Sequence, residues 1–416
     1  MVKLFFNLLK TIPVFGPHSI QVAFLASRIA KELSLDEAFA FQAGLFHDIG
    51  ILVPSEESFL FDDINSSFLL MKDFSGKPLH LHSILGSFVM GSVPRLKPLS
   101  NVLLKHHFPA YFLDEKEKID VYANIVFLAD QVSKYYFLEE ITFAEEIFLP
   151  LEDIKSFFFE NVYKCARTVL EREHTRWVLE DIKNGVFNEE LLEEYLKTPS
   201  SRDDLIQMGK LVSFIIDSKS KFTAEHSWRV AILSQKLGSM LRRDHGETLF
   251  IAGLFHDVGK ISVRYHLLEK PEKLNNEEYE EMKKHIHFSY RILLSERDKD
   301  WFLPAVRHHE RLDGSGYPFR LKGDAMSILD KIIQICDTFC AMVEQRPYRS
   351  PYNREEAIKK LEEQVMQGKY DKEVFGMLLE VLKDMDVRSL EIGETLRKQL
   401  REFTNEVLNR YASLVR

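Results

Sequence analysis

The sequence of 416 residues contains few cysteines and no long apolar run. Three cysteines, Cys165, Cys336 and Cys340, cannot form a disulfide framework, which excludes a small disulfide-stabilised secreted fold. Cys336 and Cys340 lie one helical turn apart, and we expect reduced thiols of the core there rather than metal ligands. The apolar stretch from Leu4 to Leu9 is too short to cross a membrane, and no cleavage site follows it. These absences predict a cytoplasmic protein that does not bind membranes.

A basic surface is missing as well. The 55 Lys and Arg residues are outnumbered by 64 Asp and Glu residues, and the net charge of −9 argues against a binder of nucleic-acid polymers. An anionic ligand must therefore be met by metal ions or by a few local basic residues. The 45% hydrophobic and 29% charged content is typical of a globular, helix-rich chain, and the length suffices for two or three domains.

Histidine is abundant, and most of it recurs at fixed positions. The first half contains His18, His47, Asp48, His82, His106, His107 and Asp130. The second half contains, in the same order, His226, His256, Asp257, His285, His308, His309 and Asp337. Asp130 follows His18 by 112 residues, and Asp337 follows His226 by 111. Ten of the fifteen histidines occupy these positions, which predicts two copies of one helical domain in tandem.

Two motifs in the second half carry the chemistry. Residues 254–260 read LFHDVGK, and residues 308–318 read HHERLDGSGYP. Adjacent histidine and aspartate offer two kinds of metal ligand, and Lys260 shares their face if the helix continues by one turn. About ten fixed positions in this order make the match specific. The two stretches resemble the HD-GYP family of metal-dependent phosphodiesterases, which act on cyclic dinucleotides.

The resemblance implies a dinuclear metal site. Two close metal ions lower the pKa of water and stabilise the transition state of phosphodiester hydrolysis, and histidine with carboxylate suits iron or manganese. One ion would be held by His226, His256 and Asp337, the other by His285, His308 and His309, with Asp257 bridging them. Lys260 would stabilise the scissile phosphate or protonate the leaving oxygen.

The resemblance also implies substrate-binding residues. Gly314 and Gly316 permit a tight turn that places Tyr317 beside the dinucleotide, although a purely structural turn is the competing interpretation. Arg346 and Arg349 resemble phosphate-binding residues of the family, because a guanidinium makes paired contacts to phosphate. A solvated surface loop is the alternative for both arginines.

Neighbouring positions limit this site. Some family members carry a glutamate four residues before the first histidine, where it helps to hold a third metal. Phe222 stands there in this chain, so we expect two metals. Glu310 and Asp313 are expected to orient the glycine-rich loop by hydrogen bonding rather than to bind metal.

The first half keeps the ligand set but lacks the other elements. Ile51 stands where Lys260 stands, FPAY follows the histidine pair in place of the GYP loop, and nothing corresponds to the arginine segment. Three interpretations remain open: a metal-loaded regulatory or structural domain, which we favour, a second phosphohydrolase site with another substrate, or an empty relic.

The sequence therefore predicts an all-α fold of tandem HD-type domains. Residues 1–140 form a degenerate HD-type domain, 141–200 a helical connector, and 201–416 an HD-GYP catalytic domain with C-terminal helices. The expected activity is hydrolysis of cyclic di-GMP to linear pGpG, with further cleavage to GMP left open. The alternatives are a related nucleotide as substrate, or a signalling module that binds the dinucleotide with little or no hydrolysis. A homodimer and a signalling partner fit either alternative.

Overall fold

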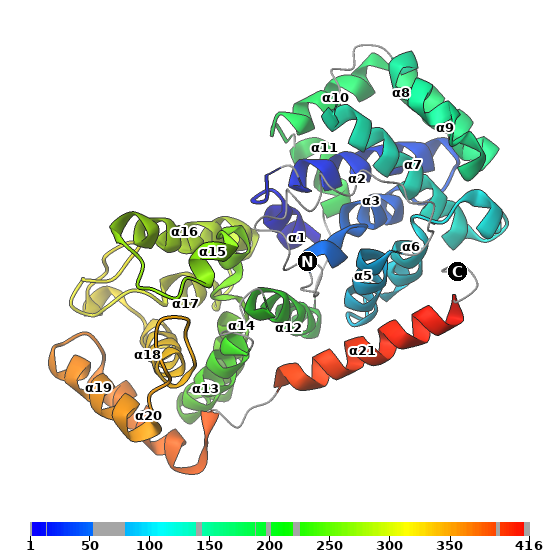
Figure 1. Ribbon diagram of the computed structural model, residues 1–416. Helices are drawn as coiled ribbons and strands as arrows, with labels where there is room; N and C mark the ends of the chain where they lie inside the picture. The colour runs from blue at the N-terminus through cyan, green and yellow to red at the C-terminus, as the bar shows by residue number, and fades with distance from the viewer. Residues whose placement is uncertain are drawn as a thin grey trace. The chain divides into compact units, whose positions relative to one another are not determined.

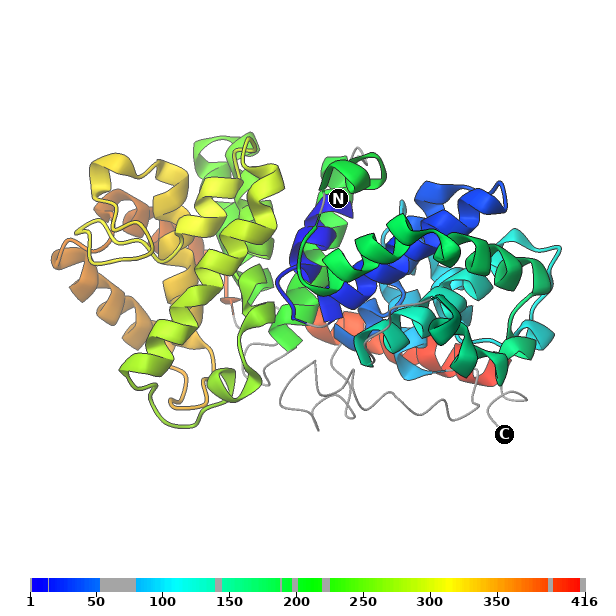
Figure 2. The ribbon, with the colours of Figure 1, turned by 90° about the horizontal axis from the view of Figure 1, so that it is seen from above.

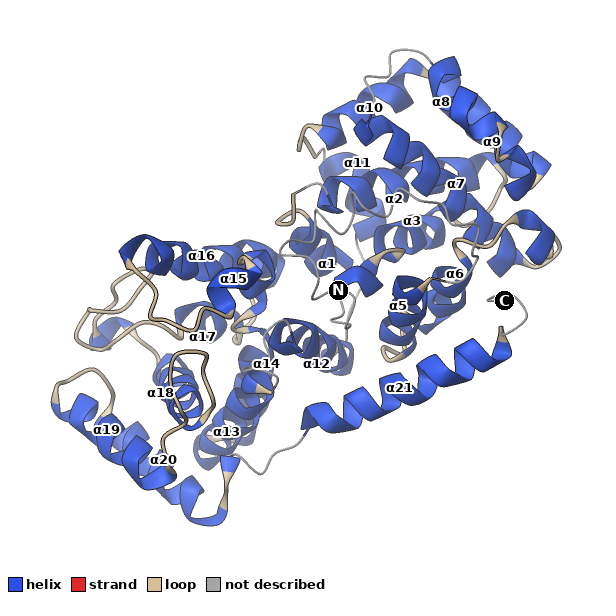
Figure 3. Ribbon diagram, viewed as in Figure 1, coloured by secondary structure: helices blue, strands red, loops and turns tan. Residues whose placement is uncertain are grey.

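The computed structural model describes residues 2–13, 15–52, 80–138, 144–187, 189–196, 201–218, 225–387 and 392–411. Across these residues the regular structure is helical, without a β-strand and with two isolated β-bridges (Figure 3). The all-α prediction is confirmed. Backbone contacts divide the chain into a first unit, Met1–Ser200 with Lys398–Arg416, and a second unit, Ser201–Arg397.

The first unit is built around helices α2, α3 and α7, which pack on one another (Figures 1 and 2). Helix α3 begins after Asp36, whose side chain caps it by accepting a hydrogen bond from the Phe39 amide. The helices of this unit are α1 (Val2–Leu9), α2 (Phe15–Glu32), α3 (Glu37–Phe46), η1 (Ile49–Leu52), α5 (Leu81–Gly91), η3 (Lys97–Leu99), α6 (Ser100–Lys105), η4 (Ala110–Phe112), α7 (Lys118–Leu138), α8 (Ala144–Glu152), η5 (Lys155–Phe157), α9 (Glu160–Glu171), α10 (Glu173–Lys183) and α11 (Glu189–Leu196).

The second unit repeats this plan with α13, α14 and α18 at its centre (Figure 1). In each unit, a short 3-10 helix follows the second central helix and packs against the next long helix, η1 against α5 and η6 against α16. The helices of this unit are α12 (Arg202–Ser218), α13 (His226–Leu241), α14 (Arg243–Phe255), η6 (Val258–Ser262), α15 (Tyr265–Leu268), α16 (Asn276–Leu293), η7 (Leu294–Glu296), α17 (Phe302–Arg307), η8 (Gly323–Ala325), α18 (Ile328–Val343), α19 (Arg354–Met366) and α20 (Lys372–Asp384).

Gly50 and Gly259, which follow the two His-Asp pairs, do not end the preceding helices. Helices α3 and α14 already end at Phe46 and Phe255, and both glycines lie inside the following 3-10 helices. A Cβ on Gly259 would overlap the carbonyl of His285, and one on Gly50 would overlap the matching carbonyl in α5. The two glycines therefore let a histidine-bearing helix approach the His-Asp motif closely.

This close approach makes Gly259→Ala strongly destabilising. Overpacking a core costs about 1–3 kcal/mol, and we expect the upper end because the obstructing atoms belong to the backbone of α16. Calorimetric unfolding of the second unit should show a lower midpoint. Gly376→Ala is the matched control: it lies in helix α20 with no atom near the added Cβ, and should stabilise by about 0.5–1 kcal/mol. A Gly259→Ala variant as stable as wild type would contradict the packing argument.

The last helix, α21 (Ile392–Arg410), contributes its C-terminal part to the first unit. Val407 is buried against Ile84 and Leu104, with Phe403 and Tyr411 beside them. From the sequence we expected all C-terminal helices to belong to the second domain, because they follow it directly. These apolar contacts instead join the end of α21 to the first unit. The apolar spacing of this helix thus serves core packing. Within the described residues, no helix combines the length and the apolarity that a membrane span requires.

Residues 167–183 of the expected helical connector belong to two helices, α9 and α10, because Arg172 between them adopts an extended backbone. Cys336 and Cys340 are buried and free, and burial raises the pKa of Cys336 to about 12, so the expectation of reduced core thiols is confirmed. Phe222 and residues 197–200, at the end of the expected connector, lie outside the described residues.

Candidate metal centres

The second unit brings its predicted ligands together from five helices. Three of the ligand groups lie in or at the start of α13, α16 and α18, and two follow directly after α14 and α17. One set of three with mutually close donor atoms, within 4.8 Å, is His226, His256 and Asp257; another is His285, His308 and His309. Six of the seven predicted ligands are buried, and the seventh, His309, is partly exposed.

Asp257 faces both groups. Its Oδ2 lies 3.2 Å from His256 Nε2 and 3.8 Å from His226 Nε2. Its Oδ1 lies 3.5 Å from His285 Nε2 and 3.8 Å from His308 Nε2. A carboxylate with imidazoles of two groups on its two oxygens has the position that a bridging ligand requires.

Asp337 connects the groups from the other side. Its Oδ1 lies 3.1 Å from His226 Nε2, and its Oδ2 lies 3.7 Å from His309 Nδ1. The other nitrogen of His226, Nδ1, donates to Glu344 Oε2 at 2.8 Å, which leaves a lone pair on Nε2 in the neutral ring. Burial alone would lower the pKa of His226, but Glu344 and Asp337 raise it to about 9, so a proton on Nε2 fills the 3.1 Å contact with Asp337, and a metal ion bound there would take the place of that proton.

The remaining imidazoles are oriented in a common way. His256, His285 and His308 each donate Nδ1–H to the carbonyl three residues earlier, of Gly253, Met282 and Ala305, at 2.7 Å. Their buried Nε2 atoms have no hydrogen-bond partner among the described residues. Outer hydrogen bonds that fix the tautomer and aim the free nitrogen inward are typical of metal-ligating histidines. The donor set therefore fits divalent metal ions.

Electrostatics hold His285, His308 and Asp257 in their ligating forms. Burial lowers the pKa of His285 to about 4 and that of His308 to about 3, so both rings are neutral near pH 7. Burial alone would raise the pKa of Asp257, but His256 and Lys260 outweigh it and hold that pKa well below its usual range. Neutral imidazoles around a carboxylate are the ligand states that metal binding requires.

Lys260 reaches the centre from a 3-10 helix, not from a continued α-helix. Its Nζ lies 2.5 Å from Asp257 Oδ2, and its side chain is 18% exposed. The cation thus stands at the border between the buried ligands and solvent, where an incoming phosphate would meet it.

The first unit assembles an equivalent cluster. Two sets of donor atoms lie within 4.8 Å of one another, one being His18, His47, Asp48 and Asp130, the other Asp48, His82, His106 and His107. As in the second unit, the imidazole of the His-Asp motif donates Nδ1–H to a carbonyl three residues earlier, here from His47 to Gly44 at 2.8 Å. The first histidine pairs with a hydroxyl instead of a carboxylate, because His18 Nδ1 contacts Ser133 Oγ at 2.9 Å.

Comparisons with known proteins agree with this duplicated geometry. Residues 16–135 and residues 210–374 each match a family model described as HD domain. The chain belongs to the HD-domain proteins, with an HD-GYP domain in its second half.

One relative matches along most of this chain, another matches over about half of it, and one solved structure shares the fold. The chain is 26% identical over 394 residues to 3′3′-cGAMP-specific phosphodiesterase 1 of Vibrio cholerae, covering 87% of this chain and 86% of the relative. The cyclic di-GMP phosphodiesterase of Thermotoga maritima is 34% identical over 204 residues, 47% of this chain and 53% of the relative. The crystal structure of V-cGAP3, a cyclic GMP-AMP-specific phosphodiesterase of V. cholerae, shares the fold, with a TM-score of 0.58 at 20% identity, covering 93% and 98% of the two chains.

The GYP loop of the second unit is held by its own residues. Glu310 is fully buried and accepts hydrogen bonds from the Phe319 and Leu321 amides at 2.7 and 2.8 Å, which confirms its expected orienting role. Gly314 has a φ of +79°, and a Cβ on Gly316 would overlap the backbone of Glu310, so both positions need glycine.

Tyr317 lies at the edge of the ligand cluster. Its ring centroid is 4.8 Å from that of His309 and 6.5 Å from that of Tyr279, and Lys283 Nζ lies 5.7 Å from it. Tyr279 and Lys283, both on α16, were not predicted as site residues, because nothing in the surrounding sequence distinguishes them from ordinary helix residues. They place an aromatic ring and a cation beside Tyr317.

The two predicted arginines have different surroundings. Arg349 donates to the carbonyls of Ala341 and Met342 at 2.8 and 3.1 Å, which satisfies the end of α18. Arg346 lies 3.5 Å from Glu344, the carboxylate that also accepts from His226. Arg346 is therefore the arginine nearer to the cluster, and phosphate binding by either stays a prediction.

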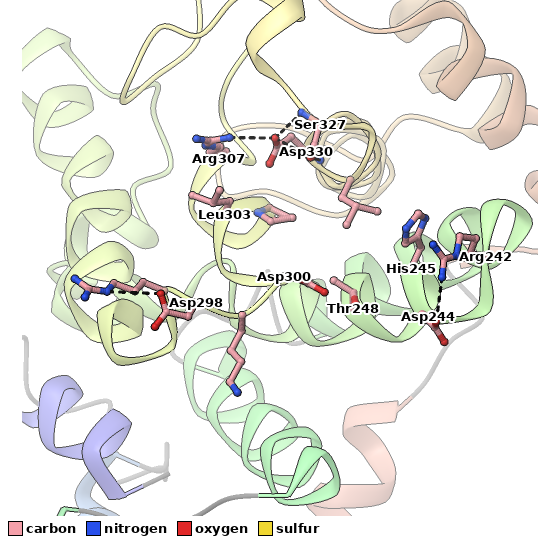
Figure 4. A pocket seen from close by; sticks show the side chains of 14 residues that line it. Arg242, Asp244, His245, Thr248, Asp298, Asp300, Leu303, Arg307, Ser327 and Asp330 are labelled. Atoms are coloured by element: carbon pink, nitrogen blue, oxygen red, sulfur yellow. Dashed lines mark hydrogen bonds and ion pairs between the residues drawn. The ribbon is translucent and has the colours of Figure 1, made fainter.

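A pocket of about 500 Å³ opens elsewhere in the second unit (Figure 4). Its lining is rich in charged side chains that pair with one another, as Arg307 does with Asp330 at 3.3 Å and Arg242 with Asp244 at 3.5 Å. None of the predicted metal ligands lines it. The cavity is thus separate from the HD-GYP cluster.

Proposed function

We propose that the second unit is a metal-dependent phosphodiesterase that opens cyclic dinucleotides. The observation that carries this proposal is the buried ligand cluster, whose free nitrogen and oxygen atoms converge while Lys260 stands beside Asp257 at its rim. The names of the relatives support the substrate class, since both are phosphodiesterases of cyclic dinucleotides.

The metal ligands and Lys260 have separate roles in this proposed reaction. Two divalent ions, iron or manganese, would lower the pKa of the attacking water and neutralise charge on the phosphoryl group. Asp257 holds the two ligand groups at a common carboxylate, and the histidines keep their Nε2 lone pairs directed inward. Lys260 stabilises the phosphoryl oxygens or gives a proton to the leaving ribose oxygen. Water adds across one ester bond, and the ring opens to a linear dinucleotide.

Two substrates are favoured by separate observations. The motif resemblance points to cyclic di-GMP, with pGpG as the product and GMP after a second cleavage. The relative that matches along most of both chains is specific for 3′3′-cGAMP, which makes the mixed nucleotide a second candidate.

Chromatography of reaction products tests the proposal. Protein reloaded anaerobically with iron or manganese is incubated with cyclic di-GMP and, separately, with 3′3′-cGAMP, and the linear products are quantified. We expect a linear dinucleotide from at least one of them, and its loss after chelation. If both nucleotides bind yet are recovered unchanged from metal-loaded protein, the signalling module without hydrolysis is the better description.

A further inference from the structure

Lys134, on α7 of the first unit, points into the cluster of its own unit. Its Nζ lies 2.6 Å from Asp130 Oδ2, and it acts electrostatically on His82 and His107. Ala341 stands at the matching place in the second unit, four residues after Asp337. The first unit therefore supplies a protein cation where the second unit supplies none.

The histidines near this cation are paired with each other. His82 Nε2 lies 3.0 Å from His107 Nε2, so one nitrogen carries a proton and the other accepts it. In the second unit, the Nε2 atom of His285, the counterpart of His82, has no hydrogen-bond partner among the described residues. Two of the three imidazoles that would hold the second metal are thus engaged in the first unit.

The other half of the first cluster has the opposite character. Ser133 Oγ donates to Gln21 Oε1 at 2.7 Å, so it accepts the hydrogen bond from His18 Nδ1. His47 Nδ1 donates to a carbonyl, which only accepts. In the neutral rings both Nε2 atoms therefore carry lone pairs, and they face each other at 3.3 Å. The contact therefore needs positive charge between the two nitrogens, either a proton on one of them or a metal ion. Asp48, 3.2 Å from His47 Nε2, and Asp130, 3.2 Å from His18 Nε2, supply the negative charge that favours a cation there.

We propose that the Lys134 ammonium replaces one of the two metal ions in the first unit, which therefore binds a single divalent cation. The ligands of that cation are His18, His47, Asp48 and Asp130. A two-metal mechanism needs a pair of ions, so this unit lacks it. A single ion joining α2, α3 and α7 instead stabilises the fold by binding only the folded state. This assigns the first unit a structural or regulatory role.

Metal counting in the full-length protein tests the proposal. Wild type, Lys134→Met and Asp48→Ala are reloaded anaerobically with Mn²⁺, and manganese per chain is measured by mass spectrometry. Asp48→Ala should hold one ion fewer than wild type, and Lys134→Met one ion more. Electron paramagnetic resonance should show an isolated Mn²⁺ signal in wild type that becomes spin-coupled in Lys134→Met. Equal manganese in wild type and Lys134→Met, or a loss of two ions in Asp48→Ala, would overturn the proposal.

Two further variants complete the design. Lys105→Met removes another lysine of the first unit, one that pairs with Asp120 at 2.5 Å and none of the cluster residues, and should leave the manganese content unchanged. Ala341→Lys places an ammonium at the matching point of the second unit and should remove one ion there. If Lys134→Met fails to fold, Ala341→Lys decides: retention of every ion in that variant contradicts the replacement of metal by lysine.

Discussion

Asp257→Ala should abolish hydrolysis of cyclic dinucleotides, while Asp48→Ala should leave it close to wild type. Asp257 has two imidazoles of one ligand group near its Oδ2 and two of the other near its Oδ1, so its removal separates the two metal positions. We expect a fall in kcat of at least about 10³-fold, the upper end of what the loss of one preorganised electrostatic group costs. The measurement is the rate of linear product formation at saturating substrate.

Asp48 is a close control because its surroundings match. Its Oδ2 lies 3.2 Å from His47 Nε2, the same distance that separates Asp257 from His256. The two variants thus cause equal local damage in different units, and circular dichroism checks that both remain folded. Hydrolysis that survives Asp257→Ala but disappears with Asp48→Ala would place the reaction in the first unit and refute our assignment.

The ligand cluster was predictable because its residues sit at helix ends and faces that the repeat reveals. The His-Asp pair follows directly after α3 in one unit and after α14 in the other, at the point where the next element packs. The order of the seven ligands in one half then identifies the seven in the other. Spacing sufficed because a duplicated fold returns equivalent positions to equivalent places.

Lys134 was not predictable in this way. Sequence comparison of the halves assigned a lysine only to the place of Lys260 and found Ile51 there. Lys134 lies on α7, whereas Lys260 lies on the short helix η6, so the two lysines do not occupy matching positions. The contact between Lys134 and Asp130 is what shows that Lys134 belongs to the cluster. Asp130 and Lys134 are four residues apart, a spacing that allows an ion pair on a helix. Whether the ammonium turns into the cluster or to solvent depends on rotamers and burial, which spacing does not supply.

The residues behind the first histidine also differ in a coordinated way that the sequence did not reveal. In the second unit, Glu344 accepts from His226 and from Arg229, which lies three residues further along α13. In the first unit, Ser133 and Gln21 make the corresponding neutral contacts. A carboxylate partner makes an imidazole a stronger metal ligand than a hydroxyl does. The ligand cluster of the second unit is therefore electronically distinct from its copy.

Lys260→Met should lower kcat by about 10²–10³-fold, the usual cost of removing one donor that stabilises transition-state charge. Methionine keeps the length of the side chain and removes only the charge and the proton. Because Lys260 contacts Asp257 from the solvent side, manganese content should stay at the wild-type value. If kcat is the same in Lys260→Met and in wild type, Lys260 does not take part in the reaction.

Lys260→Arg separates the two roles that this lysine is predicted to have. Arginine keeps the positive charge beside Asp257, but its pKa is too high for it to release a proton near neutral pH. If Lys260 acts by stabilising charge on the phosphate, the arginine variant should recover a large part of the rate lost in Lys260→Met. If Lys260 protonates the leaving oxygen, Lys260→Arg should remain as slow as Lys260→Met, because general acid catalysis contributes about 10²–10⁴-fold and arginine supplies none of it. A substrate with a better leaving group than a ribose oxygen should then restore the rate of both variants, because such a group departs without a proton.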